Sequence, residues 1–264
     1  MLTKISRSLH ALAIVSIMMF LLAPVILVFP ISFSADAYVA WPPSAWSTKW
    51  YVALLHNDEM VTAFRNSLIV ASCVTAITLV VAMPAAVALT RGHFRGRDAL
   101  TSLFTAPLLL PSIVLGLAIL VVFAGYGLVG SWPGVIIGHL VITLPYALRV
   151  LITGLSTMPP FVEDAAGTLG ADPWEIFRRI TLPLMTPALV ASAALSFIVS
   201  FDEVVLSLFI AGTQLKLLPV SLYHYVESWT DPLVAAVSAL LVLGTLGIVL
   251  IVERAIGLGK AVSK

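Results

Sequence analysis

Long apolar stretches dominate the chain and are separated by short polar segments. Stretches free of charged residues run over residues 8–35, 66–90, 99–148, 180–201 and 232–252. Each reaches the roughly 20 residues that a helix needs to cross a bilayer core, and the third is about twice as long. Its middle, GYGLVGSWPG (residues 125–134), gathers turn-forming residues that divide it into two spans. The pattern therefore predicts six membrane-spanning helices.

The first apolar stretch has two interpretations. Lys4 and Arg7 precede it, as basic residues precede the core of a cleaved signal peptide. However, its apolar run is longer than the roughly 7–15 residues of such a core, and a suitable cleavage site, Ala35-Asp36-Ala37, comes late. We therefore expect a retained helix.

Composition agrees with a membrane protein. Of the 264 residues, 60% are hydrophobic and 10% are charged, and the mean hydropathy is +1.09. Soluble domains are roughly 45–50% apolar and 25% charged. We expect an all-α, polytopic helix bundle forming a single transmembrane domain over residues 1–264, in contact with membrane lipid. The net charge of +1 indicates no nucleic-acid partner, and the single cysteine, Cys73, excludes an internal disulfide.

Basic residues give the orientation, because Lys and Arg concentrate in cytoplasmic segments. If the N-terminus is cytoplasmic, eleven of the fourteen basic residues fall on that side: Lys4, Arg7, Arg91, Arg95, Arg97, Arg149, Arg178, Arg179, Arg254, Lys260 and Lys264. The three on the other side are Lys49, Arg65 and Lys216. The count predicts that both termini are cytoplasmic, which also places the segment at about residues 155–186 in the cytoplasm.

This segment, between predicted spans four and five, reads as two short helices. The first follows two prolines and carries Glu163 and Asp164 near its start, where acidic residues complement the helix dipole. Gly170 is placed to end it.

The second helix has its own start signal. Asp172 can act as the N-cap, Pro173 suits the first helical position, and Glu175 completes a capping-box spacing. One apolar edge consists of Trp174, Phe177 and Ile180. A capped helix–turn–helix on the cytoplasmic face could act as a rigid lever, although an ordinary helical loop fits the local signals equally well.

The stretch DAAGTLGADPWEIFRRITLP resembles the coupling motif of permease subunits of type I ATP-binding-cassette (ABC) importers. The motif has an acidic residue, two alanines, three residues, a glycine, nine residues and Ile-x-Leu-Pro. The matching positions are Asp164, Ala165, Ala166, Gly170, Ile180, Leu182 and Pro183. The acidic residue of the motif is usually Glu, so its role falls either to Asp164 or to the preceding Glu163.

Further stretches, WPPSAWSTKWYVALL, FRNSLIVA and SFIVSFDEVVLSLFIAG, resemble the polyamine (spermidine/putrescine)-like branch of these permeases. The resemblance implies a bacterial inner-membrane subunit that is not itself an enzyme. Its implied partners are a dimer of cytoplasmic ABC ATPases, an extracytoplasmic solute-binding protein, and a second permease, either a homologous chain or a second copy. The chain has no phosphate-binding loop. ATP and Mg²⁺ would therefore bind the ATPase, with no cofactor in this chain.

Candidate pathway residues come from two predicted spans. Asp202 and Glu203 lie at the end of span five. Carboxylates at such a depth usually face water, a partner or a substrate path. The alternatives are a structural ion pair with Arg149 or Lys216, and a solvated helix end. Ser112 stands where polyamine permeases commonly carry an acid, which weakens a polycation assignment. We expect a small organic cation such as a polyamine, or else an organophosphonate, amino-acid derivative or other organic ion.

Two other classes fit the sequence less well. A secondary transporter often shows two related halves, and no convincing repeat is present. A membrane-embedded enzyme would need converging catalytic groups, yet the five histidines are scattered, which indicates neither a catalytic nor a metal site. His139, inside predicted span four, is interpreted as a packing residue.

Overall fold

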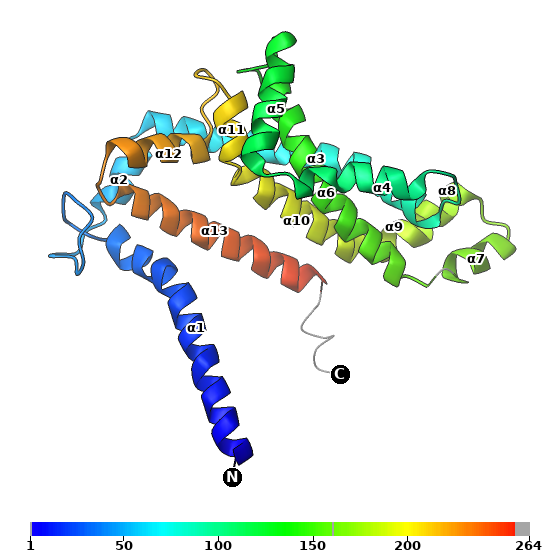
Figure 1. Ribbon diagram of the computed structural model, residues 1–264, viewed down its shortest axis with the longest axis horizontal. Coiled ribbons are helices and arrows are strands. Elements are labelled where there is room, and N and C mark those ends of the chain that lie inside the picture. The colour runs from blue at the N-terminus through cyan, green and yellow to red at the C-terminus, as the bar shows by residue number, and fades with distance from the viewer. Residues whose placement is uncertain (1, 160, 257–264) are drawn as a thin grey trace. The chain divides into compact units, whose positions relative to one another are not determined.

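The computed structural model describes residues 2–159 and 161–256, and these residues are almost entirely helical (Figure 1). Over these two ranges the β structure is a single isolated bridge between Ser34 and Trp46. The predicted all-α class is thus confirmed. Pro160, Lys260 and Lys264, which entered the sequence predictions, lie outside the described residues.

The helices vary widely in length. The longest are α1 (Leu2–Ser32), α3 (Asp58–Arg91), α6 (Trp132–Thr157) and α13 (Leu233–Ile256). Those of intermediate length are α4 (Arg97–Thr105), α5 (Ser112–Gly125), α7 (Phe161–Thr168), α10 (Thr186–Phe201) and α12 (Leu218–Ser228). Short helices are α2 (Lys49–Leu55), η1 (Ala106–Leu109), α8 (Pro173–Ile176), η2 (Phe177–Thr181), α9 (Leu182–Leu184) and α11 (Val205–Ile210).

Four helices are long and apolar enough to cross a membrane, and two bent pairs raise the number to as many as six. The predicted division of the third stretch is confirmed, since α5 ends at Gly125 and α6 begins at Trp132. The two spans expected to be continuous are bent: α4–η1 meets α5 at 107°, and α8–α9 meets α10 at 68°. Prolines stand at both bends, where each removes a backbone N–H. The count of six spans stays a prediction.

Contacts divide the chain into two compact units, of which the larger is built mainly from Thr62–Ser221. Within it, α10 packs along α6, and α11 packs against α5 and α6 (Figure 1). One apolar cluster centres on Leu206 and Ile210, and a second on Leu148 and Leu151, all fully buried. Helix α6 contributes to both clusters, so it is the central support for α10 and α11.

The smaller unit contains α1, α2 and the loop between them. In this loop the Asp36 carboxylate accepts hydrogen bonds from the side chains of Ser34 and Ser44 and from the backbone N–H of Ser44. These bonds, the Ser44 hydroxyl first, hold the pKa of Asp36 below its usual value. The loop that carries the exposed Trp41 and Trp46 is therefore tied down by local polar contacts rather than by burial.

Candidate functional site

A helical hairpin, defined here as residues 161–184, follows α6. Its first arm, α7, carries Glu163 and Asp164 in its first turn. Beyond α7, Gly170 adopts a φ of +91°, and the N–H groups of Gly170 and Ala171 donate to the carbonyls of Gly167 (3.0 Å) and Ala166 (3.1 Å). This pair of bonds is a Schellman motif, which satisfies the last carbonyls of the helix. Gly170 therefore ends the first helix as predicted, and glycine is favoured at this position because φ is positive.

The second arm begins at the predicted cap. Asp172 Oδ1 accepts hydrogen bonds from the N–H groups of Trp174 (2.8 Å) and Glu175 (3.0 Å). Only this half of the expected capping box forms, because the Glu175 carboxylate lies 3.6 Å from the Arg179 guanidinium on the next turn. One side-chain oxygen therefore fixes where the second arm starts.

The second arm is less regular than the sequence suggests. After α8 the backbone forms a π-helical turn, η2, followed by the short α9. A π turn adds one residue, which rotates the following side chains relative to an α-helix. Thr181 is consequently buried at 3% exposure, whereas Trp174 at the start of the arm is 65% exposed and stacks on Phe177. Of the predicted apolar edge, Trp174 and Phe177 stack on each other and Ile180 is half-buried.

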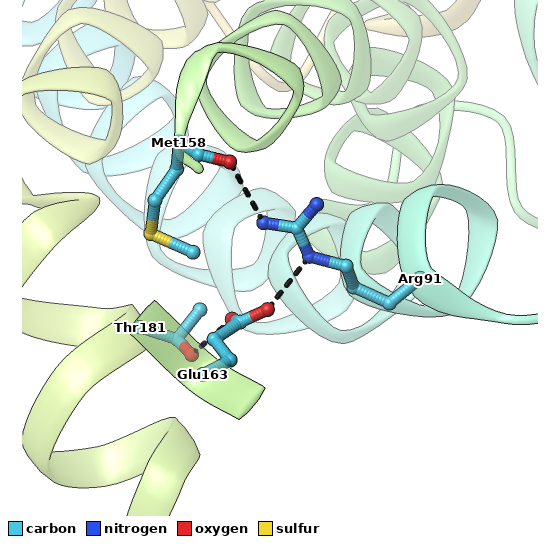
Figure 2. Close-up of polar contacts among 4 residues, drawn as sticks. All are labelled: Arg91, Met158, Glu163 and Thr181. Atoms are coloured by element: carbon cyan, nitrogen blue, oxygen red, sulfur yellow. Dashed lines mark hydrogen bonds and ion pairs between the residues drawn. The ribbon is translucent and has the colours of Figure 1, made fainter. Parts of the chain in front are cut away.

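A polar clasp, defined by Arg91, Glu163, Thr181 and the backbone carbonyl of Met158, joins both arms to the bundle (Figure 2). Arg91 Nε lies 2.8 Å from Glu163 Oε2, and the Thr181 hydroxyl donates to Glu163 Oε1 at 2.6 Å. A guanidinium N–H of Arg91 also donates to the Met158 carbonyl at 3.2 Å. One carboxylate therefore connects α3, α7 and η2.

The clasp is largely shielded from water. The side chains of Arg91 and Glu163 are 23% and 17% exposed. A partly shielded pair with additional hydrogen bonds is stronger than an exposed ion pair, and its geometry is more restricted. The two arms are therefore held to the end of α3 as one body.

The motif residues occupy different environments around the clasp. Asp164, Ala165, Gly170 and Pro183 are exposed, whereas Ala166, Ile180 and Leu182 are half-buried. Of the two candidate acids, Glu163 makes the internal contacts and Asp164 faces outward. In the sequence, Arg91 indicates only the orientation in the membrane. No sequence feature distinguishes it from the neighbouring Arg95 and Arg97 as a residue that contacts the hairpin.

The outer surface of the hairpin carries large apolar side chains. Phe161 is 69% exposed, Leu169 is 89% exposed and Trp174 is 65% exposed. Apolar groups of this size, gathered on one small element rimmed by charged residues, are typical of a protein contact surface. The hairpin is thus attached to the bundle through the clasp and keeps large apolar side chains exposed.

The second group of predicted residues lies at a break between α10 and α11. Helix α10 ends at Phe201 and α11 begins at Val205, so Asp202 and Glu203 occupy non-helical backbone. Asp202 is exposed, and Glu203 is half-buried and accepts a hydrogen bond from the Leu206 N–H at 2.9 Å. We call residues 202–204 the acidic break.

The ion pairs of the described residues include none between the acidic break and Arg149. The alternative of a structural pair with Lys216 stays a prediction. Ser112, the third candidate, is exposed at the start of α5. Helix α5 packs against α11, yet Ser112 makes no hydrogen bond to either carboxylate within the described residues. The two acids are consecutive residues of the break, and Ser112 is not hydrogen-bonded to them.

Comparison with known proteins gives a consistent result. Residues 78–254 match a family described as the binding-protein-dependent transport system inner membrane component. The chain is 33% identical over 238 residues to the Escherichia coli putrescine transport system permease protein PotI, covering 87% of this chain and 84% of that one. It is 30% identical over 234 residues to the Haemophilus influenzae spermidine/putrescine transport system permease protein PotC, with coverages of 88% and 90%.

A solved structure shares the fold. A bacterial ABC transporter involved in the import of the acidic polysaccharide alginate superposes with a TM-score of 0.72 at 18% identity, covering 94% of each chain. At this identity the likeness concerns the arrangement of helices alone.

Proposed function

We propose that this chain, which belongs to the family of inner-membrane components of binding-protein-dependent transport systems, forms part of the solute pathway of an importer for a small organic cation. In this proposal an ATPase drives transport by moving the helical hairpin. The family expected from the coupling motif is confirmed. Its relatives are transport permeases, so the chain is a multi-pass permease subunit of the inner membrane and not an enzyme. Its fold is that of an ABC importer permease.

The clasp is the observation that supports the coupling role most strongly. An ATPase can move the pore only if the contact surface transmits force without deforming. The hairpin meets this requirement, because Glu163 ties both arms to Arg91 at the end of α3 while Leu169 and Trp174 stay exposed. Closure of two ATPases would shift two such hairpins and swing the attached helices as rigid bodies.

This role requires specific partners. An importer of this family uses an ATPase and a solute-binding protein. We propose that two ATPases contact the hairpins of two permeases, one of them this chain and the other a homologous chain or a second copy. ATP and Mg²⁺ bind the ATPases, and this chain carries no cofactor. Both termini then lie in the cytoplasm, as the distribution of basic residues predicts.

The cargo proposal rests on the relatives and on the acidic break. PotI and PotC are named for putrescine and spermidine transport. Asp202 and Glu203 supply two adjacent carboxylates, and such groups attract ammonium ions. Another small organic ion is the alternative, since a shared permease fold also serves the acidic polysaccharide alginate.

Gly170 offers a direct test of the hairpin. A side chain added there meets no atom within 4 Å, so a substitution acts only through the positive φ. Gly170→Val should cost roughly 1–2 kcal/mol in the native turn and reduce the amount of co-purified ATPase by about five- to tenfold. Membrane insertion should be unchanged. The measurement is the ATPase-to-permease ratio after detergent extraction and affinity purification.

Gly170→Asn is the matched control, because asparagine tolerates the left-handed region better than other residues. It should retain most of the bound ATPase. Equal, undiminished ATPase recovery and normal uptake in both variants would show that the turn has no part in docking.

A further inference from the structure

His139 of α6 contacts both helices that flank the acidic break. Its Nδ1 lies 2.9 Å from the Ser200 hydroxyl oxygen, and its Nε2 lies 3.1 Å from the Ser207 hydroxyl oxygen. Ser200 is in the last turn of α10 and Ser207 is in the first turn of α11. One ring therefore spans the break from one helix end to the other.

The contacts satisfy every polar atom of the ring. A neutral imidazole has one donor and one acceptor nitrogen, and each serine hydroxyl can donate or accept, so either tautomer forms both bonds. His139, Ser200 and Ser207 are 2%, 4% and 1% exposed. Buried polar groups that lose a partner are costly, which favours one fixed arrangement of the three side chains.

The ring itself sits on a fixed support. The Thr143 hydroxyl donates to the backbone carbonyl of His139 at 2.9 Å and lies 2.9 Å from the Thr78 hydroxyl of α3. At Gly138 an added Cβ would lie 2.4 Å from Ile210 Cδ1, so the Ile210 side chain of α11 packs directly on α6 at this glycine. His139 therefore lies on a helix that is held by contacts with α3 and with α11.

The hydrogen bonds of the acidic break itself are local. The Asp202 N–H closes the last turn of α10 by donating to the Ile198 carbonyl at 3.0 Å, and Glu203 caps α11 through the Leu206 N–H. Both bonds are local to one helix end. The relative placement of the two ends, and with it the spacing of the two carboxylates, depends on how α10 and α11 pack on α6 and on the contacts that join the two helix ends.

We propose that His139 is a positioning residue for the transported cation: by binding Ser200 and Ser207 together it sets the spacing of Asp202 and Glu203. The histidine itself does not touch the cargo. This inference rests on the proposed function, in which the two carboxylates contact a cation that carries more than one ammonium group.

The test measures uptake of labelled putrescine and spermidine in cells that lack their own polyamine importers and express the complete transporter. His139→Leu should lower the uptake rate per assembled complex about tenfold, as expected when two hydrogen bonds are lost. It should also change the putrescine-to-spermidine rate ratio by about threefold or more, because the two cations differ in the spacing of their charges. A loss of complex alone cannot move this ratio.

Two variants separate positioning from packing. His139→Gln keeps one donor and one acceptor and should restore part of the rate and the ratio. Ser200→Ala with Ser207→Ala removes only two hydroxyls and should reproduce the His139→Leu phenotype, which keeps the test valid where leucine prevents assembly. Ser192→Ala is the matched control: Ser192 is buried in α10, its hydroxyl has no hydrogen-bond partner, and uptake should be unchanged.

The outcomes distinguish this inference from the function on which it rests. The inference is overturned if the serine double variant and His139→Leu keep the wild-type rate ratio while Asp202→Asn with Glu203→Gln abolishes uptake. If the carboxylate variant leaves uptake unchanged, the proposed cargo contact fails and the positioning role fails with it. A loss of assembled complex with an unaltered ratio would assign His139 to packing alone and also overturns the inference.

Discussion

Replacement of Arg91 by alanine should leave the permease in the membrane but reduce coupled uptake by at least about tenfold. The substitution leaves the largely shielded Glu163 carboxylate without its cation. Breaking such a pair costs about 3 kcal/mol, the low end of the range for buried pairs. That energy corresponds to a change of roughly a hundredfold in the equilibrium between the attached and the detached hairpin. ATP hydrolysis should continue and be largely disconnected from transport, which is measured as cations imported per ATP hydrolysed.

Graded variants sharpen this result. Arg91→Lys keeps the charge but cannot reach Glu163 and the Met158 carbonyl with one planar group, so an intermediate loss is expected. Glu163→Gln still accepts from Thr181 and should also be intermediate. Arg95→Gln removes an exposed arginine a few residues away and should have almost no effect. Normal coupling in Arg91→Ala, or an equal loss in Arg95→Gln, would disprove the clasp.

The second large effect is expected at the acidic break. Asp202→Asn with Glu203→Gln removes two charges while preserving shape, and the glutamine amide oxygen can still cap α11. The attraction between a carboxylate and a cation at 4 Å rises from about 1 kcal/mol in water to about 4 kcal/mol at a partly shielded site. Uptake of labelled putrescine per assembled complex should fall by at least about tenfold, with assembly and basal ATPase activity preserved.

Competition by unlabelled solutes tests the charge of the cargo independently. Excess spermidine should suppress wild-type uptake, whereas excess sulfate should not. If the double variant instead lowers the yield of assembled complex, the carboxylates are structural and the cargo is anionic or neutral. Unchanged uptake together with unchanged assembly would identify a solvated helix end.

Local features of the hairpin could be predicted because the signals are short-range. Asp172 caps a helix through N–H groups two and three residues away, and Gly170 ends one through its own backbone freedom. The clasp could not be predicted, because Arg91 and Glu163 lie far apart in the sequence and their contact depends on the packing of α6 against α3. The same holds for His139, whose serine partners belong to α10 and α11.

The bends show a second limit of sequence reasoning. An uncharged stretch of sufficient length indicates a span, but not whether the helix is straight. Pro111 and Pro187 were visible in the sequence, yet the sharp 107° and 68° turns nearby depend on what packs against each half. The π turn that buries Thr181 has the same origin, since it places the hydroxyl on Glu163. Long-range partners, rather than local propensity, determine these details.

The central claim is that the hairpin is the surface on which the ATPase acts, and a photocrosslinking experiment tests it most directly. A benzophenone amino acid is introduced at Leu169, which is 89% exposed, and separately at Tyr38, which is 70% exposed in the loop after α1. In membranes containing the complete transporter, irradiation should yield an adduct with the ATPase from position 169 and none from position 38. Absence of an adduct at 169, or an ATPase adduct at 38, would contradict both the docking surface and the predicted orientation.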